Sequence, residues 1–475
     1  MRSMFRSTVA PALALSLLSA CGGGGGDGAE AEEARPHDQR VFTVDQAALA
    51  FPALSESSVE TDRWSGVLDG AGYRIEVPKN WNGQLVMYAH GYGGTGTTLG
   101  VTTPPLRRYL IEHGYAWAAS SYRANYYDVR AGVEDTNALA LAFTKIAAER
   151  GRVLAAPSRI FITGHSMGGH VTAAAIEDET RATARHKVSY AGAVPMCGVM
   201  GDTELFDYFG AYQLVAQQLA GRPATRFPTS DWAAQQQAVR EALFTSFPSG
   251  LTAQGQKLKG ALMNLTGGAR PIFEQGFTNA GLHGVVWGTL GGDGTINGIL
   301  TRNVVDTTRF TYQFDSDPAL STEEQAFNNA IIDANAEPDA NRLRRDGLRW
   351  IPKVNGQFDI PVVSLHTLGD MYVPFSMQQI YRRRVEQQGN GDRLVQRAIR
   401  APSHCDFTVA EQAAAFQAMV DWADGGPKPA GDDVLDAATV AQPTYGCAHT
   451  DNSDGPDDNA AVIAVRAQLP ACPAD

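Results

Sequence analysis

The stretch "RIFITGHSMGGH", residues 159–170, decides the fold prediction for this chain. Four apolar or β-branched residues, Ile160 to Thr163, lead into a turn with the pattern Gly-x-Ser-x-Gly, in which Gly164 and Gly168 flank Ser166. Such a turn between a strand and a helix can expose a serine hydroxyl, because glycine leaves room for a sharp change of direction. The alternative is an ordinary glycine-rich turn that contains a serine, so the rest of the chain has to decide between them.

Strand-like and helix-like patterns alternate on both sides of this stretch. Strands are expected at residues 73–78, 83–90, 115–122, 188–198, 360–370 and 394–405, and helices at 104–114, 133–151, 168–179, 377–389 and 411–426. Near-continuous apolar strands separated by helices predict a mostly parallel sheet with helices on both faces. The α/β core is therefore expected to consist of residues 63–198 and 357–426.

Residues 199–356 interrupt this alternation. They contain helix-like pieces, such as residues 207–221 and 231–244, with glycine-rich turns between them. We expect a large, mainly helical insertion between the sixth and seventh strands of the sheet. Residues 427–475 are predicted to form a loose acidic tail, and its Asp-rich part, residues 451–458, is interpreted as a solvated loop because its spacing departs from that of an EF-hand calcium loop.

The N-terminus predicts export. Arg2 and Arg6 precede the apolar run Val9–Ala20, which is too short to span a bilayer and is typical of a signal peptide over residues 1–20. The sequence Leu18-Ser19-Ala20-Cys21 resembles a bacterial lipobox, which implies lipidation of Cys21; the alternative is an ordinary secretory signal cut near Ala20. Within the N-terminal segment 21–62, the Gly- and Glu-rich residues 22–38 predict a flexible tether.

The net charge and the cysteines limit the kinds of molecule and metal that the protein is expected to bind. The formal net charge is −12 and no basic tract is present, so nucleic acids and anionic membrane surfaces are poor partners, and membrane contact is expected only through the lipid anchor. Export permits disulfides. Besides Cys21 the chain has four cysteines, Cys197, Cys405, Cys447 and Cys472. They allow three sets of pairs, and their spacing does not choose between these sets. No CxxC or other metal-type spacing occurs, so no metal site is expected. We expect Cys447 and Cys472 to clip the tail.

Residues 63–424, apart from the insertion, resemble the α/β-hydrolase superfamily, in its secreted esterase and lipase branch. The resemblance rests on the Gly-x-Ser-x-Gly turn, on His90-Gly91-Tyr92-Gly93-Gly94 directly after a strand, and on Leu368-Gly369-Asp370-Met371-Tyr372-Val373-Pro374, which keeps an Asp-x-x-Val-Pro pattern. It implies that Ser166 is a nucleophile, and that acid and base follow it in the order Asp, His. It also implies that the backbone N–H groups of Tyr92 and Met167 form an oxyanion hole.

Asp370 and His404 are the candidates for the acid and the base. Asp202 is a rival acid, because it follows the strand that ends near Cys197. His404 lies on the loop after the last strand, which in this superfamily reaches back towards the serine. The other histidines are less suitable by position, since His37 lies in the tether, His165 in the turn itself and His449 in the tail, while His170 and His366 are expected to be structural and His90 to order its glycine-rich loop.

Cys405 follows His404 directly, an arrangement similar to that of the tannase and feruloyl-esterase group, in which a disulfide braces the triad. In that group the other cysteine stands beside the serine, whereas this chain has His165 there. The resemblance therefore implies a bridge to another cysteine, for which Cys197, at the end of the neighbouring strand, is the candidate. Two buried free thiols are the alternative.

The leading hypothesis is an exported carboxylic ester hydrolase that needs no cofactor. In the superfamily's topology the insertion lies above the active site as a cap, and its apolar clusters at residues 206–212 and 281–292 either cover an apolar or aromatic part of a small or polymeric ester, or form the cap's own core. A serine peptidase of the aminopeptidase kind and an acyltransferase are alternatives on the same fold. A surface lipoprotein that binds a ligand without catalysis is the alternative from another class.

Overall fold

The computed structural model describes residues 32–473. The predicted signal peptide, the lipidation site Cys21 and residues 22–31 of the predicted tether lie outside the described residues. From Ala34 onward the described chain forms one unit. Within the described part, none of the helices combines the length and the apolar character needed to cross a membrane.

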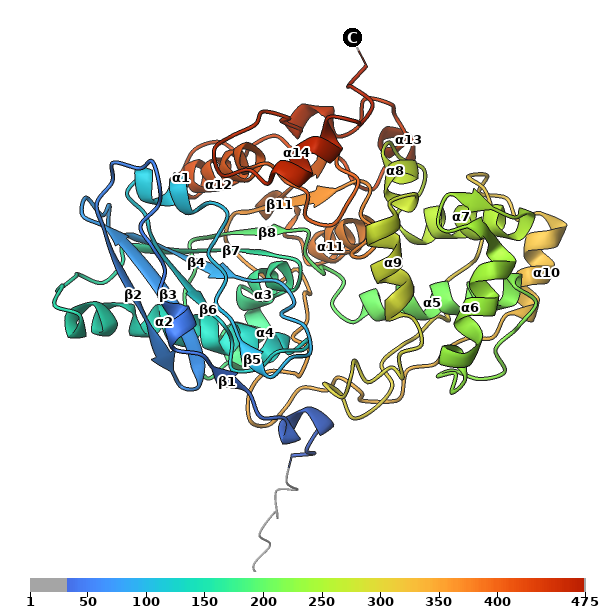
Figure 1. The fold of residues 1–475 in the computed structure, drawn as a ribbon, viewed down its shortest axis with the longest axis horizontal. Helices are drawn as coiled ribbons and strands as arrows, with labels where there is room; N and C mark the ends of the chain where they lie inside the picture. Colours follow the sequence, from blue (N-terminus) through green and yellow to red (C-terminus); the bar gives the residue numbers. More distant parts are fainter. Residues whose placement is uncertain (1–31, 474–475) are drawn as a thin grey trace, which may run out of the picture. The chain divides into compact units, whose positions relative to one another are not determined.

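An eight-stranded sheet forms the centre of this unit, with the strand order β12-β11-β8-β7-β4-β6-β3-β2 (Figure 1). The pairs β2–β3 and β3–β6 are antiparallel and the remaining neighbours are parallel, so the predicted mostly parallel sheet is confirmed. The strands are β2 (Thr61–Leu68), β3 (Ala71–Pro78), β4 (Gln84–Ala89), β6 (Ala116–Ser120), β7 (Arg159–His165), β8 (Gly192–Met196), β11 (Val362–Thr367) and β12 (Leu394–Ile399). Strand β2 was not predicted, and the expected core boundary at residue 63 falls inside it.

Helices cover both faces of the sheet. Along β4, Leu85 and Met87 enter the hydrophobic cluster on one face, while Val86 and Tyr88 enter the cluster on the other, as the two-residue period of a strand requires. One face carries α2 (Val129–Glu149), α3 (Met167–Ala175) and α11 (Ser376–Gln387), and α4 (Asp178–Thr183) contacts α3. The other face carries α1 (Arg107–Glu112) and α12 (Val409–Ala423).

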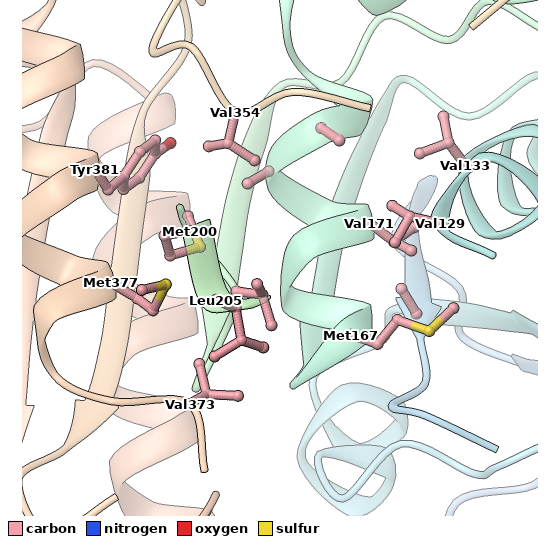
Figure 2. Close-up of a cluster of buried hydrophobic side chains, with 14 of the residues drawn as sticks. Val129, Val133, Met167, Val171, Met200, Leu205, Val354, Val373, Met377 and Tyr381 are labelled. Carbon is pink, nitrogen blue, oxygen red and sulfur yellow. The ribbon is translucent and has the colours of Figure 1, made fainter. Parts of the chain in front are cut away.

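Helix α3 is enclosed by apolar side chains on both flanks (Figure 2). Val171 faces Val129 and Val133 of α2, and Met200 and Leu205 lie between α3 and α11. The segment that follows the Gly-x-Ser-x-Gly turn is therefore anchored in the core.

The insertion between β8 and β11, the sixth and seventh strands of the sheet, is built mainly of helices (Figure 1). Its elements are α5 (Glu204–Leu219), α6 (Trp232–Leu243), β9 (Phe244–Ser246), β10 (Gly250–Leu251), α7 (Ala253–Leu265), α8 (Phe273–Phe277), α9 (Ala280–Thr289) and α10 (Thr322–Ala330). Helices α5, α6 and α7 pack against one another, and β9 and β10 form a short antiparallel pair.

The N-terminal segment contradicts the prediction of a flexible tether for its last residues. A 3₁₀-helix covers Pro36–Gln39, and a second one covers Ala47–Leu49. Between them, the short strand β1 (Thr43–Val44) pairs with β5 (Thr98–Leu99). Arg35 is buried and donates to Asp128, which caps α2, at 2.7 Å. The tether prediction is therefore wrong for residues 35–38, because their partner lies 93 positions away and leaves no local signal.

The C-terminal tail is also packed, so the expectation of a loose tail is wrong. It contains α13 (Ala437–Val440), a 3₁₀-helix over Cys447–His449 and α14 (Ala460–Arg466). Arg466 is buried and binds both carboxylate oxygens of Glu411 in α12. The Asp-rich residues 451–458 are largely exposed, as predicted, but a buried ion pair holds the tail against α12. A third 3₁₀-helix, Gly391–Arg393, precedes β12.

Candidate active site

Ser166 stands at the turn between β7 and α3 with a strained backbone. Its φ of 57° and ψ of −122° lie where a side chain is rarely tolerated, and its N–H donates to the carbonyl of Met196 at 3.0 Å. A Cβ atom at Gly164 would lie 2.6 Å from the carbonyl oxygen of Ala89, and one at Gly168 would lie 2.0 Å from the same oxygen. The two glycines are required because the end of β4 passes directly beside the turn.

Three predicted residues meet in one series of hydrogen bonds. His404 Nε2 lies 2.8 Å from Ser166 Oγ, and His404 Nδ1 lies 2.5 Å from Asp370 Oδ2. Asp370 is fully buried, and its Oδ1 accepts from the N–H groups of Tyr372 at 2.8 Å and Val373 at 3.0 Å. In the tautomer with the proton on Nδ1, the imidazole can accept the serine proton while the carboxylate stabilises the imidazolium that results.

The rival acid, Asp202, is occupied elsewhere. It is buried and accepts from Arg384 at 2.7 Å and from the N–H of Val354 at 3.1 Å. The cation holds the pKa of Asp202 below its usual value although burial opposes this. Asp202 is therefore an ion-pair partner between the start of the insertion and α11.

The histidines considered as alternatives to His404 have partners of their own. His366 Nε2 lies 2.8 Å from the carbonyl of Val373, and His170 lies between Tyr127 Oη and the carbonyl of Pro352. Burial lowers the pKa of His366 and of His165 to about 4, so both are neutral at pH 7. The ring of His90 stacks on Tyr122, and its Nδ1 lies 2.6 Å from the carbonyl of Gly91, which suits its predicted role in ordering the loop.

The two amides predicted to form an oxyanion hole lie next to Ser166. Met167 is the first residue of α3, where N–H groups lack intrahelical acceptors. Tyr92 follows Gly91, at which a Cβ atom would lie 3.3 Å from Ser166 Cβ. Among residues 32–473 no backbone carbonyl accepts from either amide. An oxyanion hole formed by Tyr92 and Met167 stays a prediction.

Two disulfides are present, Cys197–Cys405 and Cys447–Cys472. The first links the end of β8 to the residue after His404, and Cys197 Sγ lies 3.3 Å from the N–H of Ser166. It is the pairing that the resemblance to tannases and feruloyl esterases implied, with Cys197 in place of a cysteine at position 165. One bond thus connects the surroundings of the serine to the loop of the histidine.

The same residues form the one cluster of potential metal ligands within the described chain, Cys197, His404 and Cys405. Both sulfurs belong to the disulfide, and both ring nitrogens of His404 are within hydrogen-bond distance of Asp370 or Ser166. The cluster therefore offers no free ligand.

The packed tail contributes contacts to the His404 loop that sequence analysis missed. Arg466 Nη1 donates to the carbonyl of Asp406 at 3.1 Å, and Thr408 Oγ1 donates to the carbonyl of Asp451 at 3.0 Å. The capping-box pattern from Thr408 to Glu411 was the local signal for a helix start, but nothing nearby in sequence indicated that Arg466 would bind Glu411. The loop is thus held by the disulfide and by the tail.

A cavity of about 380 Å³ contains Ser166 in its wall. The core contributes Tyr92, Tyr127 and Tyr372, and the insertion contributes further apolar side chains, which include Leu205, Phe206, Phe209, Phe227, Leu290 and Ile296. Among the described residues that line it, none carries a charge. The insertion thus contributes apolar side chains, and no charged ones among the described residues, to the space beside the serine.

The strand order of the sheet and the places of the three residues identify the fold. Ser166 follows the fifth strand of the sheet, Asp370 the seventh and His404 the eighth. The fold is that of the α/β-hydrolases. The predicted α/β-hydrolase fold and the resemblance on which it rested are therefore confirmed, whereas the role of the insertion as a cap stays a prediction.

The chain is distantly similar to several known proteins. No protein-family model matches the chain. An o-phthalyl amidase of Xanthobacter agilis is 23% identical over 446 residues, which cover 83% of this chain and 95% of that protein. Among solved structures, feruloyl esterase B from Aspergillus oryzae is similar at 14% identity and a TM-score of 0.44, covering 82% of this chain and 86% of its own. The rice cell wall degrading esterase LipA from Xanthomonas oryzae is similar at 14% identity and a TM-score of 0.33, covering 75% of this chain and 83% of its own.

Proposed function

We propose that the protein is an exported serine hydrolase that cleaves carboxylic esters through an acyl-enzyme intermediate. The observation that carries this proposal is the hydrogen-bonded series Ser166, His404 and Asp370 at the wall of an apolar cavity. A non-catalytic binding protein would have no need of a strained serine that is aligned with a histidine and a buried carboxylate.

The mechanism follows from this geometry. Ser166 Oγ attacks the ester carbonyl while His404 Nε2 takes its proton, and His404 then returns the proton to the departing alcohol oxygen. Asp370 stabilises the imidazolium, and the N–H groups of Tyr92 and Met167 receive the negative charge on the former carbonyl oxygen. Water, activated by His404, then releases the acid and restores the serine.

Export is part of the proposal. Two disulfides are typical of proteins that fold in an oxidising compartment. Together with the apolar run Val9–Ala20 they support a bacterial envelope protein that is anchored through lipidated Cys21, or a periplasmic or secreted form cut near Ala20.

A fluorophosphonate probe tests the nucleophile, since it labels only a serine that is activated. The wild-type protein should be labelled and should hydrolyse short p-nitrophenyl esters, whereas Ser166→Ala should lose both properties with an unchanged melting temperature. Ser158→Ala, on the exposed loop before β7, is the matched control and should behave as wild type. Label on the Ser166→Ala variant, or a wild type that is neither labelled nor active on a broad panel of esters, would contradict the proposal.

Hydrolysis of amides is a second candidate, favoured by the similarity to the o-phthalyl amidase over most of both chains. The described cavity wall has no carboxylate that could pair with the free amino group of a peptide, so an N-acyl amide fits better than an aminopeptidase substrate. A p-nitrophenyl ester and the p-nitroanilide of the same acyl group separate the two candidates. We expect kcat/KM to be higher for the ester, and a preference for the anilide would assign an amidase. Added alcohols that divert the acyl group from water would assign an acyltransferase.

A further inference from the structure

Part of the cavity wall consists of glycines. Residues 210, 288, 291, 292 and 294 all line the cavity, and all are glycine. They form two groups, according to whether a Cβ atom placed at the position would collide with a neighbouring residue.

Three of these glycines are required by close packing. A Cβ atom would lie 2.6 Å from Val305 at Gly210, 2.2 Å from Trp232 at Gly291, and 1.8 Å from Asn303 at Gly294. Any side chain at these three positions would displace a neighbour within the insertion. Their absence of a side chain therefore says nothing about a ligand.

Gly288 and Gly292 are different. A Cβ atom at either position would meet no atom within 4 Å, and neither backbone lies in the left-handed region. Gly288 lies in the last turn of α9, where a larger residue would also favour the helix. Neither packing nor backbone conformation requires glycine here. Both residues are exposed and both line the cavity, so the space beside them is the part of the cavity that opens to solvent.

The surroundings of this space specify its occupant. Tyr92, Phe206, Phe209 and Tyr372 give the cavity an aromatic and apolar character. Gln213, a polar residue of the wall, is already engaged, since its Nε2 lies 3.2 Å from Gln217 Oε1 and 2.5 Å from Thr229 Oγ1, and its Oε1 accepts from the N–H of Gly291. A carboxylate or ammonium group placed beside these aromatic side chains would lose part of its water without gaining a partner of opposite charge.

We propose that the cavity binds an uncharged aryl or medium-chain alkyl acyl group, and that Gly288 limits the size of the group that is accepted. The acyl carbon lies at Ser166, and the far end of the acyl group occupies the space beside Gly288 and Gly292. This inference rests on the proposed function, because it assigns a substrate class to the same serine. The volume of about 380 Å³ is typical of a pocket for a small organic group and exceeds what an acetyl group needs.

The test uses p-nitrophenyl esters that differ only in the acyl group: acetate, octanoate and 3-phenylpropionate. Gly288→Leu fills the open space, so kcat/KM should fall about 30-fold for the two large esters and change less than about 3-fold for the acetate. Gly284→Leu is the matched control, because Gly284 lies one turn earlier in α9, has equally open surroundings and does not line the cavity. That variant should leave all three values unchanged.

A second variant and a second substrate pair make the result independent of one substitution. Gly292→Leu should discriminate against the large esters in the same direction as Gly288→Leu. For the wild type, an acyl chain that ends in a carboxylate should give at least about a 10-fold lower kcat/KM than the methyl-ended chain of equal length.

The outcomes distinguish this inference from the proposed function. If Gly288→Leu and Gly292→Leu treat acetate and the large esters alike, while the probe still labels Ser166, the inference is wrong and the proposed function stands. A wild type that prefers acetate or the carboxylate-ended chain would also overturn the inference. If the wild type is neither labelled nor active on any ester, the proposed function fails.

Discussion

The two sides of the cavity are built from different interactions. On the core side, Ser166, His404 and Asp370 are held by directed hydrogen bonds and a disulfide. On the insertion side, the wall is formed by aromatic and aliphatic side chains and by glycines that leave space open. Directed bonds fix the positions of reacting atoms, whereas apolar packing determines size and polarity. A change on the core side should therefore affect all substrates alike, and a change on the insertion side should affect substrates selectively.

The core side is over-determined by contacts from distant parts of the chain. Cys197 belongs to the end of β8, Cys405 to the loop after β12, and Arg466 to the C-terminal helix α14. Each holds either the serine or the loop of the histidine in place. A Cβ atom at Gly288 would meet no described residue within 4 Å, so the wall there can change without disturbing the reacting atoms.

Asp370→Asn should give the largest effect. The amide would turn an N–H towards His404 and favour the wrong tautomer of the imidazole, so kcat should fall about 10⁴-fold for small and large esters alike. Steady-state kinetics with acetate and octanoate esters measure this.

Asp202→Asn is the matched control for that prediction. It should leave kcat within about 3-fold of wild type and lower the melting temperature, because Arg384 loses the buried one of its two carboxylate partners and keeps only Glu204. The reverse pattern, with activity lost in Asp202→Asn and kept in Asp370→Asn, would assign Asp202 as the acid.

Removal of the Cys197–Cys405 disulfide should give the second largest effect, on both stability and kcat. By the chain-entropy relation, a crosslink between residues 208 positions apart contributes about 5 kcal/mol to the free energy of unfolding, and one between residues 25 positions apart about 3.5 kcal/mol. The double variant Cys197→Ser, Cys405→Ser should also lower kcat about 10-fold for every ester, since it loosens the His404 loop and changes the partner of the Ser166 N–H.

The double variant Cys447→Ser, Cys472→Ser is its control, and it should lose stability with little change in kcat. Unfolding by denaturant and kinetics with a small and a large ester measure both variants. If the first double variant affected only large esters, the separation between a core side and an insertion side would be wrong.

Asp406→Asn should give the smallest of these effects. It should raise the melting temperature slightly, by an amount that depends on pH. Burial and the nearby Asp370 raise the pKa of Asp406 to about 6, above the 3.8 of an ordinary aspartate. Between these two pH values the folded chain retains a proton that the unfolded chain has lost, so this group's contribution to stability declines as the pH rises and is fully unfavourable above about pH 6. The asparagine variant avoids the penalty, and its melting temperature at pH 7.5 should exceed that of wild type by about 2 °C.

At pH 4.5 this difference should be smaller, because Asp406 is then protonated in the folded protein. Calorimetry at the two pH values measures it, with Asp392→Asn at an exposed site as the control. A difference in melting temperature of the same size at both pH values would contradict the prediction.

Local sequence determined most of the core and the order of the site residues. The apolar runs that became β4, β7 and β11 are visible because a buried parallel strand needs side chains of one kind on both faces. The turn around Ser166 is visible because the close passage of β4 requires glycine at fixed positions. The sequence offered two candidates for the acid of the triad, Asp370 and Asp202. Asp202 is excluded because it pairs with Arg384, which lies 182 positions away in the chain.

The tertiary structure alone decided the features that depend on distant partners. It buries Arg35 against Asp128 and Arg466 against Glu411, although composition predicted a flexible tether and a loose tail. It also distinguishes Gly288 from Gly291. The sequence shows a glycine at both positions, but Trp232 lies against Gly291 and no neighbour lies against Gly288. Periodicity and turn chemistry are local and can be read along the chain, whereas a buried charge pair or an open space depends on which residues the fold brings together.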